Sequence, residues 1–197
     1  EFVAQNDGKG LDYYVEQEDE KVLDKLTKYF RNEGFVSLVI GAMHFTKQIP
    51  IQRVIEMCEG IKLPIILLGG PDEKSKAEEI IKTSKNPNVH SMAGECSLNE
   101  SAVVIKHSKA VITSDTGLMH IAAAFHKPIF SLWGSTIPEY GMYPYLPNEE
   151  NKQHIYEVKN LSCRSCSKIG HQKCPKKHFD CMEKIDYQRL IQEINKI

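Results

Sequence analysis

The sequence lacks long apolar runs and carries almost no net charge. No stretch approaches the roughly 20 consecutive apolar residues of a transmembrane helix, and residues 1–7 have neither the basic end nor the apolar core of a signal peptide. The formal net charge is −1, and no basic run is interleaved with aromatic residues, as nucleic-acid binding would favour. We therefore expect a cytoplasmic protein with no transmembrane segment and no nucleic-acid partner.

Two common glycine motifs are also missing. Neither G-x-G-x-x-G nor G-x-x-x-x-G-K-[ST] occurs, so dinucleotide oxidoreductases and P-loop proteins lose their main sequence support. What is present is an ordinary globular composition: 197 residues, 41% hydrophobic and 26% charged. This length predicts one domain, spanning residues 1–197, with a sizeable core.

Strand-like and helix-like patterns alternate along the chain. Continuous apolar strands separated by amphipathic helices predict an α/β fold: a parallel sheet with helices on both faces and ligands at the carboxyl ends of the strands. The expected strands are 13–15, 35–40, 64–68, 88–92, 110–113 and 128–133, and the expected helices are 19–33, 50–59, 74–84, 97–105, 117–125 and 186–197.

Residues 111–125 are the most informative segment, because Ser-Asp-Thr-Gly joins a β-branched strand to an apolar helix. A helix start has unpaired N–H groups and a partial positive charge, which suits phosphate. Asp115 or Thr116 can cap this helix, Gly117 lets a ligand approach, and His120 lies one turn in. The alternative is a well-capped structural helix with a core histidine.

Further polar loops favour a binding site over that alternative, since they follow other strands of the same predicted sheet. Lys47 can offer a point charge to a diphosphate, although a solvated loop lysine is the alternative. The four loops at this edge are 46–47, 72–73, 114–117 and 134–136.

Together these residues resemble glycosyltransferase family 9, whose best-known members are the ADP-heptose:lipopolysaccharide heptosyltransferases. The resemblance runs from about Tyr14 to the C-terminus. It is carried by Lys47, LGGPDE at 68–73, SDTGLMHIAAA at 114–124, LWGST at 132–136 and a late C-x-x-C.

The resemblance implies a GT-B enzyme of two Rossmann-like domains. In such enzymes the C-terminal half binds the nucleotide sugar, and the N-terminal half binds the acceptor and carries the catalytic base. The 197 residues look like the C-terminal half only, so we expect the N-terminal domain to be absent and the chain alone to be inactive. The implied partners are a nucleotide sugar, ADP-heptose, and a lipopolysaccharide core acceptor reached through the N-terminal domain, with a location at the inner membrane surface.

The resemblance also implies roles for individual residues. Lys47 and Asp115 would be the catalytic residues, with Lys47 neutralising the donor phosphates and Asp115 near the sugar and pyrophosphate. Preorganised N–H groups and a lysine can stabilise the departing diphosphate, so we expect no metal and no cofactor besides the donor substrate. The remaining binding residues would be Thr116 and Gly117 at the phosphates, His120 in the same helix, and Asp72 or, preferably, Glu73 at the ribose hydroxyls.

A second pattern, Cys163-x2-Cys166-x7-Cys174-x6-Cys181, occupies the cysteine-rich segment, residues 161–182. Its spacing leaves three alternatives open: a structural zinc site, reduced or partly paired thiols, and two disulfides. We assign no metal ligand here. Cys58 and Cys96 are expected to be small buried side chains.

Two further questions stay open. Tyrosines within residues 134–145 can stack on a base or sugar, but packing of the loop onto the domain is the stronger expectation. The functional alternatives are an epimerase-like GT-B domain, which would act on the donor itself, and a non-catalytic binding module.

Overall fold

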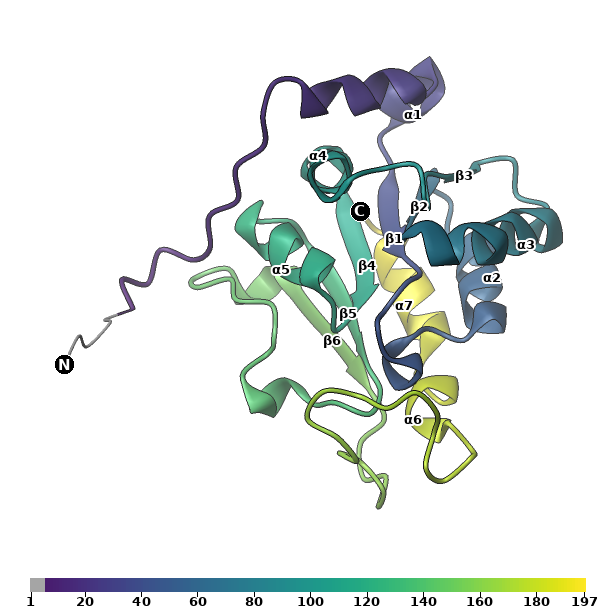
Figure 1. The fold of residues 1–197 in the computed structure, drawn as a ribbon, viewed down its shortest axis with the longest axis vertical. Coiled ribbons are helices and arrows are strands. Elements are labelled where there is room, and N and C mark those ends of the chain that lie inside the picture. Colours follow the sequence, from purple (N-terminus) through teal and green to yellow (C-terminus); the bar gives the residue numbers. More distant parts are fainter. Residues whose placement is uncertain (1–5) are drawn as a thin grey trace.

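The computed structural model describes residues 6–197 and contains a six-stranded parallel sheet (Figure 1). The strand order is β3-β2-β1-β4-β5-β6, and every neighbouring pair is parallel. The predicted α/β class is thus confirmed. The strands are β1 (Val36–Val39), β2 (Ile65–Leu68), β3 (Val89–Ser91), β4 (Ala110–Ser114), β5 (Ile129–Trp133) and β6 (Gln153–Glu157).

Helices cover both faces of the sheet (Figure 1). One face carries α2 (Ile51–Gly60), α3 (Lys74–Ser84), α6 (Asp180–Glu183) and α7 (Tyr187–Ile194), and the other carries α1 (Lys28–Glu33), α4 (Leu98–His107) and α5 (Gly117–Ala124). No helix among residues 6–197 is long and apolar enough to cross a membrane.

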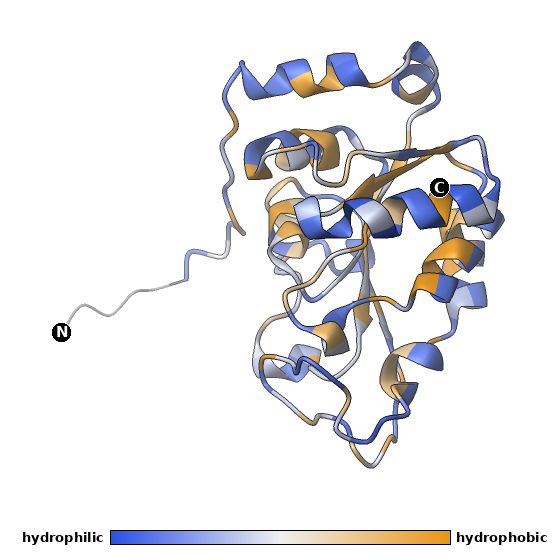
Figure 2. Ribbon diagram, turned by 45° about the vertical axis from the view of Figure 1, so that its right-hand side comes forward, coloured by the Kyte–Doolittle hydropathy of each residue, from blue (hydrophilic) through white to orange (hydrophobic). Residues whose placement is uncertain are grey.

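The sheet is buried on both faces because successive side chains point in opposite directions. In β2, Ile65 and Leu67 pack under α2 and α3, whereas Ile66 and Leu68 pack under α4 and α5. Figure 2 shows apolar strands between helices whose outer sides are hydrophilic.

Local capping signals in the sequence fix several helix starts. Ser97 Oγ accepts from the N–H of Glu100 at 3.1 Å, and the Glu100 carboxylate accepts from the N–H of Ser97 at 2.7 Å, so Ser-x-x-Glu at 97–100 forms a capping box at the start of α4. Pro50 directly precedes α2, and Asp186 caps α7 through the N–H of Arg189.

Two predicted elements differ in the structure. Residues 13–15 form no strand, because Tyr13 lies along the helices, donating to Asn99 and packing on Phe125. The helix predicted over 19–33 is divided into a 3-10 helix (Asp19–Lys25) and α1, since Leu26 and Thr27 adopt extended backbone.

The sheet has a switch point between β1 and β4. These strands are neighbours, yet the chain proceeds from β1 to β2 on one side and from β4 to β5 on the other. The following helices, α2 and α5, cover opposite faces. Such a divergence opens a crevice at the carboxyl ends of the two strands.

Candidate nucleotide-binding site

A cleft of about 950 Å³ lies at the carboxyl ends of the strands, at this switch point. Loops after β1, β2 and β4 and the first turns of α4 and α5 line it. The structure therefore brings together residues that are far apart in the chain. All the predicted site residues line the cleft: Lys47, Glu73, Asp115, Thr116, Gly117 and His120.

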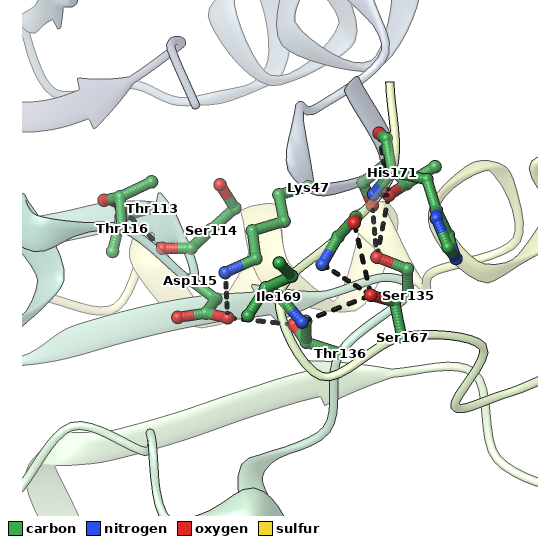
Figure 3. A network of polar contacts seen from close by, with 12 residues as sticks. Lys47, Thr113, Ser114, Asp115, Thr116, Ser135, Thr136, Ser167, Ile169 and His171 are labelled. Carbon is green, nitrogen blue, oxygen red and sulfur yellow. Dashed lines mark hydrogen bonds and ion pairs between the residues drawn. The ribbon is translucent and has the colours of Figure 1, made fainter. Parts of the chain in front are cut away.

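A nearly buried ion pair lies at one side of the cleft (Figure 3). Lys47 Nζ is 2.7 Å from Asp115 Oδ2, and the two side chains are 13% and 6% exposed. The hydroxyl of Thr136 donates to the same carboxylate oxygen at 3.0 Å. The solvated-loop alternative for Lys47 is therefore wrong: Asp115 holds the ammonium in place.

The start of α5 is accessible from the cleft. Thr116 is the N-cap residue, but it makes no side-chain cap bond, and its hydroxyl lies 3.0 Å from that of Thr113. Because Asp115 is turned to Lys47, the expected side-chain cap is wrong at both positions. A Cβ at Gly117 would meet nothing within 4 Å, so an anion can approach this helix end.

His120 and Glu73 occupy other walls of the cleft. His120 is half-buried and lines the cleft, which argues against the core-histidine alternative. The Glu73 carboxylate accepts from the N–H of Gly70 at 2.8 Å and lies so close to Gly41 that a Cβ there would come within 2.7 Å of it. Asp72 also lines the cleft but is exposed. The carboxylate of Glu73 is thus the more fixed of the two.

Sequence reasoning assigned no role to the residues that hydrogen-bond to Asp115 or to Thr46, the residue before Lys47. Thr46 precedes Lys47; its N–H donates to the carbonyl of His171 at 3.1 Å, and its hydroxyl accepts from the N–H of His171 at 2.8 Å. Ser135 donates to the hydroxyl of Thr46 at 2.9 Å (Figure 3). Ser135 and Thr136 lie in the polar loop predicted after a strand, which was the available signal.

The cysteine-rich segment surrounds a second, much smaller cavity of about 20 Å³, lined by Cys163, Cys166, Cys174, Cys181 and His178 among others. All the cysteines are free thiols. Cys163 Sγ lies 3.7 Å from His178 Nε2. Within residues 6–197, no group of three or more His, Cys, Asp or Glu side chains is arranged to hold a metal ion.

The cysteine thiols differ in pKa. Burial raises the pKa of Cys181 to about 11. Burial acts in the same direction on Cys174, but hydrogen bonds from the backbone of residues 176–179 outweigh it and bring the pKa of that thiol below its ordinary value. Burial likewise raises the pKa of Cys96 to about 11. Cys58 is buried as expected, whereas Cys96 is only partly buried and lines the large cleft.

The tyrosines of residues 134–145 lie apart from the cleft, and two of them, Tyr140 and Tyr143, are exposed. Tyr143 packs edge-on against Tyr145, whose hydroxyl accepts from Asn6. Among the described residues that line the cleft there is no tyrosine.

The strand order and the position of the cleft define the class of this protein: a Rossmann-like α/β domain with a cleft at its switch point, where open α/β sheets bind their ligands. The family model described as "Glycosyltransferase family 9 (heptosyltransferase)" matches residues 8–176. The chain therefore belongs to glycosyltransferase family 9.

Relatives include lipooligosaccharide heptosyltransferase 2 of Haemophilus influenzae, 48% identical over 79 residues that cover 40% of this chain and 22% of that protein. The solved E. coli ADP-heptose lipopolysaccharide heptosyltransferase II superposes with a TM-score of 0.71 at 22% identity, over 94% of this chain and 52% of that one. E. coli heptosyltransferase WaaC with ADP gives 0.58 at 20% identity, over 90% and 48%. The chain thus spans about half the length of these solved structures, which share its GT-B-like Rossmann fold.

Proposed function

We propose that this chain is the donor-binding domain of a heptosyltransferase and that the cleft binds the nucleoside diphosphate of ADP-heptose. One observation carries the proposal: a fixed lysine and an uncapped helix start face the same cleft at the switch point. Of the described residues lining the cleft, Lys47 is the single lysine or arginine. A diphosphate in this cleft therefore depends on Lys47 and the start of α5 for compensation of its charge.

The ion pair prepares Lys47 for this role. An ammonium has three donors, and Asp115 takes one of them, which leaves the others for phosphate oxygens. The start of α5 supplies backbone N–H groups and a partial positive charge near Thr116 and Gly117. Negative charge that develops on the diphosphate as the sugar leaves would meet groups already in position. Lys47 and Asp115 are the catalytic residues of the proposal.

The other cleft residues would contact the rest of the donor. Glu73 has one carboxylate oxygen committed to Gly70, and its second can accept from a ribose hydroxyl. His120, one turn into α5, would lie beside the phosphates or the sugar. The proposed site uses the Lys47 ammonium and the dipole of α5, without a metal or a further cofactor.

The acceptor side of the reaction would come from another domain. In this proposal a carboxylate of that domain deprotonates a hydroxyl of the lipopolysaccharide core, which then attacks the anomeric carbon opposite the diphosphate. The 197-residue chain would bind donor without turnover, in the cytoplasm at the inner membrane surface. Family membership disfavours an epimerase-like domain and a non-catalytic binding module.

Calorimetric titration of the 197-residue chain with ADP, UDP and GDP tests the proposal. We expect ADP to bind best, and Lys47→Ala to weaken it about a hundredfold, since charge-assisted hydrogen bonds to a diphosphate are lost. Lys82→Ala, an exposed lysine on α3, is the matched control and should bind as the parent does. Failure to bind any of the three nucleotides would remove the proposal. For the full-length protein, heptose transfer to a core acceptor, rather than epimer formation, is the expected activity.

A further inference from the structure

The loop after β5, residues 134–136, contacts Asp115 directly and contacts Thr46, the residue before Lys47 (Figure 3). Thr136 donates to the Asp115 carboxylate at 3.0 Å. Ser135 donates to the hydroxyl of Thr46, next to Lys47, at 2.9 Å, and the Ser135 N–H donates to the Thr46 carbonyl at 3.4 Å. A shift of this loop would therefore displace the carboxylate and the lysine relative to each other.

One buried side chain of the cysteine-rich segment, which lines the small cavity and not the cleft, hydrogen-bonds to this loop. Arg164 is 7% exposed, and its Nη1 lies 2.6 Å from Oε2 of Glu157. Its Nε donates to the carbonyl of Gly134 at 2.8 Å, and its Nη2 donates to the carbonyl of Thr136 at 3.2 Å. The two accepting carbonyls stand on either side of Ser135.

We propose that Arg164 is a positioning residue of the nucleotide site, whose Glu157-anchored guanidinium holds residues 134–136 so that Thr136 and Ser135 keep Asp115 and Lys47 aligned for a diphosphate. The inference rests on the proposed function, because it assigns a task to the ion pair of the same site.

The chemistry of the side chain suits this task. A guanidinium is planar, and its donors are arranged as a rigid fork, so one side chain reaches the Gly134 carbonyl, the Thr136 carbonyl and the Glu157 carboxylate together. A lysine in this place has one ammonium and cannot span the same three acceptors. A buried ion pair often adds little stability over apolar packing, so the value of Arg164 lies in the geometry that it imposes.

The first test is Arg164→Lys in the 197-residue chain, with ADP affinity measured by calorimetry. We expect affinity to fall about tenfold, since the charge stays but the paired hydrogen bonds to the loop are lost. Arg31→Lys is the matched control, because Arg31 is half-exposed and, among residues 6–197, its guanidinium pairs with the exposed Asp24 alone, and it should bind ADP as the parent does. Arg164→Lys binding like the parent would overturn the inference.

A second measurement separates positioning from general loss of structure. In Arg164→Ala, added methylguanidinium should restore ADP affinity and methylammonium should not, because only the former reproduces the fork. In a Thr136→Val background, which lacks the hydroxyl that reaches Asp115, Arg164→Lys should cost much less than in the parent. Equal losses in both backgrounds, or rescue by methylammonium as good as that by methylguanidinium, would indicate a merely structural arginine and overturn the inference.

Two controls keep the result interpretable. Thermal unfolding shows whether Arg164→Lys folds. If it does not, Glu157→Gln replaces it as the test variant. This variant keeps the arginine, and it should weaken ADP binding by less than the loss expected for Arg164→Lys. A parent chain that binds no ADP contradicts the proposed function, whereas a binding parent with unaffected arginine variants contradicts this inference alone.

Discussion

The large cleft and the cysteine-rich segment lie at the same edge of the sheet but are built in opposite ways. The cleft has about 950 Å³ of space between strand ends and helix starts, whereas the thiol-lined cavity has about 20 Å³. The two regions meet where His171 bonds to Thr46, beside Lys47. The comparison teaches that short connections between strand ends and helix starts present the ligand-facing groups here, while the longer cysteine-rich segment contacts those connections from outside the cleft.

The largest expected effect is at the ion pair on the cleft side. Asp115→Ala should lower the free energy of unfolding by about 3 kcal/mol, because it leaves a nearly buried ammonium without its carboxylate. Urea denaturation of the 197-residue chain measures this. Asp24→Ala removes a carboxylate that is 79% exposed from a pair with Arg31, and it should cost about 0.5 kcal/mol or less. Similar losses in both variants would show that the Lys47–Asp115 pair is solvated in solution.

The next largest effect on stability is expected for Gly134→Ala, beside the cysteine-rich segment, compared with Gly117→Ala in the cleft. A Cβ at Gly134, where the regions meet, would lie 2.7 Å from the carbonyl oxygen of Thr46 and 2.8 Å from Met182 Cγ, so Gly134→Ala should cost about 2 kcal/mol. Gly117→Ala places its methyl in the open cleft and should change stability by about 0.5 kcal/mol or less while weakening ADP binding. Urea denaturation and calorimetry of both variants check this. Comparable destabilisation by both would mean that the cleft is closed at the start of α5.

The smallest effect concerns the thiols of the cysteine-rich segment and tests whether Cys181 stays buried. Near pH 8, Cys174 should react with iodoacetamide at least about tenfold faster than Cys181, since the pKa of Cys174 is lowered and that of Cys181 is raised to about 11. Peptide mass spectrometry after timed alkylation gives both rates. Raising the pH should accelerate Cys181 up to about pH 11, whereas Cys174 levels off earlier. In urea the two rates should converge; convergence without urea would contradict the burial of Cys181.

Much of the fold could be predicted because buried parallel strands are continuously apolar. Strand β6 escaped detection, since in this edge strand Tyr156 is the one buried residue and no apolar run marks it. Helix α6 has four residues, too few to show a helical period. The break at Leu26 and Thr27 was invisible because the apolar period of residues 19–33 continues through it.

The sequence could predict which loops form the candidate site at one edge of the sheet, but not which of their side chains contact one another. Parallel strands bring Lys47 and Asp115 to the same edge, but sequence could not show that they pair directly. Arg164 could not be found at all, since a single arginine among cysteines carries no pattern. Its role depends on long-range packing against residues 134–136.

The divergence of the chain at β1 and β4 has one more consequence. Because the connections after these strands depart toward opposite sides, no single loop crosses the gap between them, and the course of the backbone creates the groove. The choice of ligand could thus change by altering a few loop residues, with the supporting sheet left untouched.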